Sequence, residues 1–338
     1  MPLPIHRPIA RRRLLIALGA GALAASFSTL AQQPGKVWRI GFLEPRSRPT
    51  PSNPDVFCEA FTQGMRELGY VEGKNLLIEW HFADGKYERF PGMAAELVRM
   101  KVDVIVTQGT PATEAAQRAT RTIPIVTVAV GDPIRSGFAA SLAHPGGNIT
   151  GLSFISSDVY PKQLEMLKAM LPRLSRVAVL VNPSNSRAAL TLTSVQAAAK
   201  KLGVTVIPVD ARTPEEIERG FATMRRERAD AVIVHADSLF NLHKQQVADL
   251  AARSRMPSSF VDRSLVEAGG LMSYGQNVAN YYQYGATYVD KILKGAKPGE
   301  LPFEQPTKIY LAINRKTAKA LGITIPQELL IRADEVIE

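Results

Sequence analysis

The sequence predicts an α/β protein with two Rossmann-like lobes, each built around a parallel β-sheet. Short runs rich in β-branched residues alternate with helical segments, and this alternation occurs twice along the chain. The glycine-rich stretch at 144–148 separates the two arrays and divides the chain near residue 153. With 338 residues, of which 46% are hydrophobic and 21% charged, the chain has the length and composition of about two globular domains.

The first array begins at residue 37. Apolar or alternating runs predict strands at 37–43, 75–82, 102–107 and 123–130, and residues 149–154 follow the glycine-rich stretch that joins the arrays. Helical patterns predict helices at 54–68, 87–100 and 111–119. Cys58 is the only cysteine and lies in the first of these helices, so we expect a small buried apolar residue and no intramolecular disulfide.

The second array repeats the scheme and is followed by a long tail. It contains predicted strands at 177–181, 204–209 and 231–235, and predicted helices at 187–202, 214–228 and 239–255. The tail contains a predicted strand at 271–274, a helix at 278–293 and a strand at 308–313. We assign the helix of the tail to the first lobe and the final strand and helix to the second. The first lobe is then 37–152 plus about 275–304, and the second is 153–274 plus about 305–338.

Residues 1–31 have the features of an export signal. Arginines at 11–13 precede an apolar stretch at 14–30, and small residues at 29–31 suit a signal peptidase. The arginine pair fits the twin-arginine route as well as the general secretory route, and both stay open. No later apolar run reaches the ~20 residues that cross a bilayer, and no cysteine for a lipid anchor stands at the signal exit. We therefore expect an exported, soluble protein that is not lipid-anchored.

The charge pattern argues against a nucleic-acid partner. The net charge is +10, but four of the positive residues lie in the first 31, which leaves 37 basic and 31 acidic residues elsewhere. The remaining lysines and arginines are scattered between acids, whereas a nucleic-acid footprint would be clustered. The mature protein should have a mildly basic surface.

Signatures of catalysis, cofactors and metals are missing from the sequence. There is no Gly-x-Ser-x-Gly turn, no Gly-x-Gly-x-x-Gly after a strand and no P-loop. The histidines at 81, 144, 235 and 243 are too dispersed for a metal site. We therefore expect no enzyme, no cofactor and no metal, and an exported α/β hydrolase is the least favoured alternative.

Small polar residues follow several predicted strands, where open parallel sheets bind their ligands. At Gly109-Thr110-Pro111, Thr110 has the type of an N-cap and Pro111 suits the first helical position. The backbone N–H groups of Ala112 and Thr113 would then lack intrahelical partners and favour an anion such as a carboxylate. The alternative is a capped helix that binds nothing.

Other strand ends add candidate ligand-binding residues. Asn182, Ser184 and Asn185 follow a strand of the second array in a similar design. Asp132 and Asp237 also follow strands, and either could bind an ammonium group or simply cap the next segment.

We expect two further residues to lie near the ligand-binding cleft at these strand ends. Ser47 lies in the loop after the first strand, and Tyr274 lies near a crossover and could form an aromatic wall.

Several stretches, taken in order, resemble the ABC-transporter substrate-binding family that includes the tryptophan/tyrosine-binding lipoproteins. They are 102–106 (VDVIV), 109–112 (GTPA), 130–133 (VGDP), 144–153 (HPGGNITGLS), 268–275 (AGGLMSYG), 314–322 (NRKTAKALG) and 332–336 (RADEV). The resemblance implies a type I periplasmic binding protein: two α/β lobes on a three-stranded hinge that close on a small-molecule solute. It also implies an ABC permease in the inner membrane as the partner, and we expect a monomer.

The resemblance does not carry over the identity of the solute. An amino acid or similar carboxylate is the leading candidate, because helix starts combined with an acid suit a zwitterion. An alternative within the same fold is a ligand-binding sensor domain that serves a signalling partner. The absence of a cysteine at the signal exit departs from the lipoprotein members, and together with the resemblance it implies a free receptor of the periplasm that is not lipid-anchored.

Overall fold

The computed structural model describes residues 36–50, 55–154, 159–305 and 307–338. The predicted export signal lies outside these residues. Within the described part, Trp38–Glu338 forms one unit by its internal contacts. None of the described helices combines the length and apolar character needed to span a membrane.

The first sheet consists of five parallel strands in the order β2-β1-β3-β4-β5. The strands are β1 (Trp38–Glu44), β2 (Leu76–Phe82), β3 (Val104–Gln108), β4 (Ile125–Val130) and β5 (Ile149–Ser153). Every residue of β4 and β5 is buried, which explains the nearly unbroken apolar sequence of β4.

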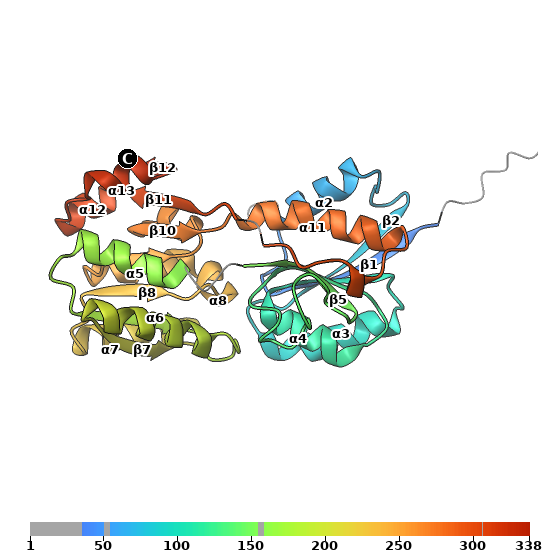
Figure 1. Ribbon diagram of the computed structural model, residues 1–338, viewed down its shortest axis with the longest axis horizontal. Helices are drawn as coiled ribbons and strands as arrows, with labels where there is room; N and C mark the ends of the chain where they lie inside the picture. The colour runs from blue at the N-terminus through green and yellow to red at the C-terminus, as the bar shows by residue number, and fades with distance from the viewer. Residues whose placement is uncertain (1–35, 51–54, 155–158, 306) are drawn as a thin grey trace, which may run out of the picture. The chain divides into compact units, whose positions relative to one another are not determined.

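Helices cover both faces of this sheet, as Figure 1 shows. Alternate strand residues such as Phe42 pack against α2 (Val56–Glu67) and α11 (Val278–Leu293). The opposite face, which includes Leu43, packs against α3 (Phe90–Arg99) and α4 (Gly109–Ala119). Period-two alternation therefore places one strand in contact with two helical layers.

The second sheet has the order β12-β11-β10-β9-β8-β6-β7. Its strands are β6 (Arg176–Val181), β7 (Thr205–Asp210), β8 (Ala231–Val234), β9 (Ser258–Phe260), β10 (Met272–Gly275), β11 (Tyr310–Asn314) and β12 (Glu335–Ile337). The pair β10–β11 is antiparallel, and the other pairs are parallel. The chain thus returns through β11 in the reverse direction.

Helices also cover both faces of the second sheet. One face contacts α5 (Val159–Met170), α6 (Ala188–Leu202), α12 (Arg315–Leu321) and α13 (Gln327–Arg332). The other contacts α7 (Pro214–Arg226), α8 (Ser238–Leu242), α9 (Lys244–Arg253) and α10 (Ser264–Glu267). The predicted fold class, two parallel-sheet α/β lobes, is confirmed.

The chain passes between the two sheets three times, after β5, between β10 and α11, and before β11. Two of these segments pair directly, because Ser153 donates its backbone N–H to Glu304 (2.9 Å) and Glu304 donates to Gly151 (3.0 Å). The crossings correspond to the three-stranded hinge that the resemblance implied.

Several elements differ from the sequence prediction. The helix predicted at 239–255 is two helices, α8 and α9, separated at His243, whose φ of −104° and ψ of 31° are not helical. The helix predicted from residue 87 begins with a 3-10 turn at Tyr87–Arg89 before α3. No strand was predicted at β9 and no helix at α5.

Candidate ligand-binding cavity

A cavity lies at the carboxyl ends of the strands in both lobes. In the first sheet β1 lies between β2 and β3, and in the second β6 lies between β7 and β8. At these positions the connections that follow neighbouring strands run to opposite sides of the strand. This divergence opens a crevice beyond the carboxyl ends of the strands. The cavity is lined by loops that follow strands of both sheets, and the space between its lining residues, open solvent included, is about 720 Å³. Its position is typical of a small-molecule site.

The first turn of α4 contributes donors to this cavity. Gly109 has φ +81°, a left-handed conformation that favours glycine, and the helix begins there directly after β3. Thr110 was predicted to be the N-cap, but the N-cap is Gln108, so that prediction was wrong. The first-turn amides without intrahelical acceptors are therefore those of Gly109 and Thr110, in place of Ala112 and Thr113.

The side chain of Thr110 is a second donor at this helix start. Thr110 lines the cavity and is only 2% exposed. Its hydroxyl has no hydrogen-bond partner among the described residues. A buried hydroxyl without a partner is costly, so a ligand atom would be favoured here.

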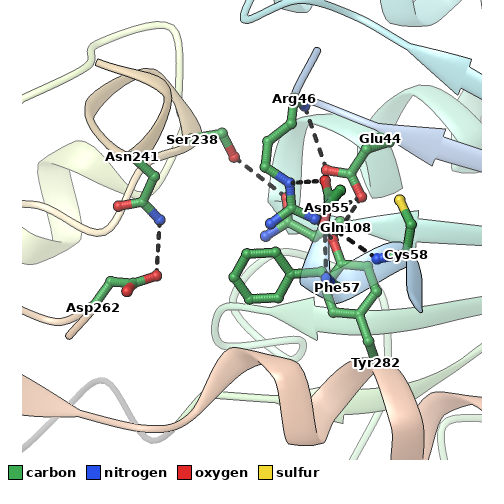
Figure 2. Close-up of polar contacts among 10 residues, drawn as sticks. All are labelled: Glu44, Arg46, Asp55, Phe57, Cys58, Gln108, Ser238, Asn241, Asp262 and Tyr282. Atoms are coloured by element: carbon green, nitrogen blue, oxygen red, sulfur yellow. Dashed lines mark hydrogen bonds and ion pairs between the residues drawn. The ribbon is translucent and has the colours of Figure 1, made fainter. Parts of the chain in front are cut away.

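Arg46 also lines the cavity, but its charge is already neutralised within the first lobe (Figure 2). Its Nη2 lies 3.0 Å from Glu44 Oε2, and its Nε lies 3.2 Å from Asp55 Oδ2. The guanidinium stacks over the Phe57 ring at 4.0 Å from the centroid and donates to the Tyr282 hydroxyl at 2.6 Å. Burial raises the pKa of Glu44, and the Arg46 charge opposes that rise.

Asp237, a predicted site residue, lines the cavity from the second lobe and is buried. It caps α8 by accepting from the Leu239 N–H (3.0 Å), and it accepts from Asn182 Nδ2 (3.1 Å) and Asn185 Nδ2 (2.9 Å). The hydroxyl of Tyr87, from the first lobe, donates a fourth hydrogen bond at 2.8 Å. Burial raises the pKa of Asp237, while these hydrogen bonds oppose the rise.

Arg187 is the residue of the cavity that the sequence reasoning missed. It precedes α6, is 8% exposed and lines the cavity. In the described chain its guanidinium has neither a hydrogen bond nor an ion pair, and its buried Nε is unpartnered. It packs against Gly131, where an added Cβ would lie 1.8 Å from Nε. Burial lowers the pKa of the guanidinium, and the nearby Tyr160 and Asp132 oppose that effect.

A neutral histidine lies beside this cation. His235 follows β8, is 1% exposed and has no hydrogen-bond partner in the described residues for either ring nitrogen. Burial first, and the Arg187 charge second, lower the pKa of His235 to about 3. The imidazole is therefore uncharged at neutral pH and adds no second cation to the site.

Aromatic and small apolar residues form the remaining walls. Tyr87, Phe90 and Phe154 line the cavity. Tyr87 and Phe90 stack with centroids 5.8 Å apart, and Phe154 packs on Tyr281 at 5.1 Å. Asp262 lines the second-lobe side and accepts from Asn241 Nδ2 at 3.2 Å, as Figure 2 shows. The cavity thus combines flat apolar walls with groups of both charges.

The predicted ligand-binding residues are only partly brought together. Those in the cavity lining are Thr110, Asn185 and Asp237. Those outside the described lining are Ser47, Ala112, Thr113, Asp132, Asn182, Ser184 and Tyr274. Their part in binding stays a prediction.

Two of this second group support the lining residues. The Thr113 hydroxyl donates to the Gly109 carbonyl oxygen at 2.9 Å, and Asn182 Nδ2 donates to the Asp237 carboxylate at 3.1 Å. Asp132 is 37% exposed at its side chain and accepts from the backbone N–H groups of Ile134 and Arg135. Asp132 therefore caps the turn that follows β4.

Comparison with known proteins agrees with this geometry. The model of the ABC transporter substrate binding protein family matches residues 53–337. A protein of Clostridioides difficile (strain R20291) described as "Tyrosine-binding protein" is 27% identical over 270 residues, which cover 80% of this chain and 77% of that protein.

Two solved structures are similar over most of the chain. An ABC domain from Streptococcus pneumonia in complex with L-Trp has a TM-score of 0.80 and 27% identity, covering 89% of this chain and 99% of that one. A substrate binding protein with adhesive properties from Clostridium difficile, in a ligand-free, open structure, has a TM-score of 0.62 and 26% identity, with 89% and 99% covered.

The fold and the cavity define a type I periplasmic binding protein. The chain belongs to the ABC transporter substrate-binding protein family, as the sequence resemblance predicted. This is a family of binding proteins and not of enzymes, which confirms the prediction made from the missing catalytic motifs.

Proposed function

We propose that this protein is a receptor that binds one free aromatic amino acid in the cavity and delivers it to an ABC permease of the inner membrane. The observation that carries this proposal is the make-up of the cavity: an unpaired Arg187, the Asp262 carboxylate and aromatic walls. A zwitterion with a planar apolar side chain complements all three features.

The relatives support the same class of ligand. One similar protein is described as tyrosine-binding and one similar structure contains L-Trp. This chain also resembles the L-Trp complex more closely than the ligand-free, open structure, although the two are almost equally identical in sequence. The higher TM-score with the L-Trp complex supports a closed arrangement of the cavity walls, like that of a ligand-bound protein.

The proposal includes the route by which the protein reaches its ligand. The signal-like residues 1–31 would direct export to the periplasm and be removed near Gln32. The mature monomer would then be two lobes, residues 37–152 plus about 275–304 and residues 153–274 plus about 305–338, that close on the solute.

Isothermal titration and thermal unfolding of the chain from Gln32 onward test the proposal. We expect binding of at least one of L-tryptophan, L-tyrosine and L-phenylalanine, with L-leucine, L-lysine and myo-inositol as comparison solutes. At ~100 times its Kd a ligand stabilises the folded state by about 2.7 kcal/mol, which raises Tm by several degrees. Binding of a comparison solute such as myo-inositol, with no response to any aromatic amino acid, would contradict the proposal.

A further inference from the structure

We infer that Arg187 binds the carboxylate of the ligand, that Thr110 binds the same carboxylate from the opposite lobe, and that Gly131 holds the Arg187 guanidinium in position. The inference rests on the proposed function and specifies the part of the amino acid that joins the two lobes. Its first step is the uncompensated charge of Arg187 in the cavity wall.

The acids around Arg187 are already engaged with other groups. Asp132 accepts two backbone N–H groups and lies 3.7 Å from Arg135 Nε. Asp237 accepts four hydrogen bonds. Glu114 accepts from the Ser186 hydroxyl at 2.7 Å and lies 3.8 Å from Arg118. Arg187 therefore remains a buried cation without a hydrogen-bonded or ion-paired acid, an unfavourable state that a ligand anion would relieve.

The groups opposite Arg187 are donors that suit an anion. The Thr110 hydroxyl is buried and has no described partner, and it lies on the first turn of α4. First-turn amides lack intrahelical acceptors and carry a partial positive charge. A carboxylate has two oxygens, so it can accept from Arg187 and from this helix start together.

Gly131 makes this position of Arg187 possible. A Cβ at Gly131 would lie 1.8 Å from Nε, 2.0 Å from Cζ and 2.1 Å from Cδ of Arg187. Gly131 follows β4 in the first lobe, whereas Arg187 precedes α6 in the second. The arginine therefore reaches this contact only while the two lobes are together, and a carboxylate bound there favours the closed state.

The inference predicts discrimination by charge. Replacing the ligand carboxylate by a carboxamide leaves Arg187 buried and unpaired, so the wild type should prefer the amino acid over its amide by at least ~100-fold. For whichever aromatic amino acid the wild type binds, titration with the acid and with its primary amide measures this preference. Failure of the wild type to bind any aromatic amino acid would overturn the proposed function itself.

Variants then assign the preference to Arg187. We expect Arg187→Gln to reduce the preference for the acid to less than ~10-fold, and Arg187→Lys to retain part of it. Arg135→Gln is the matched control, because Arg135 is also near Asp132 but its side chain is 69% exposed. If Arg187→Gln keeps the wild-type preference, or if the Arg135→Gln control loses it, the inference is wrong.

A stability measurement separates ligand binding from a structural role. Removing an uncompensated buried charge should leave the ligand-free protein at least as stable, so Arg187→Met should unfold at or above the wild-type Tm and bind no amino acid measurably. A structural arginine would give the opposite result, a lowered Tm with the preference between acid and amide unchanged.

Discussion

Gly131 shows how the absence of a side chain can shape a binding site. The Arg187 guanidinium occupies the space that a Cβ at residue 131 would take. Because Arg187 is almost fully buried, its side chain has little room to move aside.

We therefore expect Gly131→Ala to hinder lobe closure without preventing folding. Overpacking of this kind costs about 1–3 kcal/mol, which corresponds to roughly 5- to 150-fold weaker ligand binding. Isothermal titration checks the affinity, and circular dichroism checks the fold. Gly147→Ala is the matched control, because no described atom lies within 4 Å of its added Cβ. Equal affinities for the two variants would show that the Gly131 contact is irrelevant to binding.

His235 makes the stability of the folded protein decrease as the pH falls. Its pKa is about 3 in the folded state and 6.5 without the environment of the fold. Between these values the unfolded chain takes up a proton that the folded chain does not, so stability is lost as the pH falls below about 6.5. The loss is at most about 1.4 kcal/mol per pH unit.

Replacing His235 by leucine removes this contribution. Urea unfolding at several pH values from 7 to 4 should show a weaker decline of the free energy of unfolding for His235→Leu than for the wild type. The buried carboxyls of Glu44 and Asp237 titrate alike in both proteins and cancel in the comparison. His144→Leu changes an exposed histidine and should keep the wild-type slope. If the free energy of unfolding declines equally with falling pH in all three proteins, His235 is not the source of the pH dependence.

At the scale of elements, the first lobe depends on a helix that comes from far along the chain. Helix α11 packs against α2 and the first sheet, and Tyr281, Tyr282 and Tyr288 are fully buried. The two helices approach closely at Gly64, where an added Cβ would lie 2.6 Å from the Gln283 carbonyl oxygen.

We expect Gly64→Ala to destabilise the protein by about 1–3 kcal/mol, because a backbone atom blocks the added methyl group. Urea unfolding measures the change. Gly92→Ala is the control, since Gly92 lies in α3 with nothing within 4 Å of the added Cβ, and alanine there should be neutral or stabilising by up to ~1 kcal/mol. A Gly64→Ala protein as stable as the control would mean that the helices can separate at little cost.

The sequence predicted those elements whose local signals agree with their surroundings. The bounds of α11 were predicted correctly, because Asn277 caps its start and Gly295 follows its end. Strand β9 was missed because Ser258-Ser259-Phe260 has no apolar run, although all three residues are buried. Helix α5 was not predicted because most of its residues are buried, including the polar Gln163. Its sequence therefore lacks the clear separation of a polar and an apolar face that predicts a helix.

The site was less predictable than the fold, for two physical reasons. Thr110 and Pro111 have the local pattern of a helix start, but Gly109 with φ +81° lets α4 begin earlier. Arg187 follows Asn185 by two residues in an ordinary polar loop, and sequence alone does not show whether an arginine has an ion-pair partner. That information depends on residues far away, such as Gly131, that the fold brings to it.

For the whole molecule, polar contacts join the lobes around the cavity. Tyr87 donates to Asp237 at 2.8 Å, and Ser238 donates to Gln108 at 3.3 Å. Individual hydrogen bonds contribute only about 0.5–1.5 kcal/mol, so such contacts hold the lobes together weakly. A ligand that bridges both sides then needs only a modest difference in affinity to shift the population towards closure.

The late position of α11 in the chain has a consequence for biosynthesis. The Tyr282 hydroxyl donates to Glu44 at 2.6 Å and so links this helix to the end of the first strand. Because a ribosome synthesises the chain from its N-terminus, the face of the first sheet that packs against α2 and α11 stays only partly covered until α11 has emerged, after strands β6 to β10. The first lobe of the nascent polypeptide is thus open to chaperones and translocation factors throughout most of its synthesis.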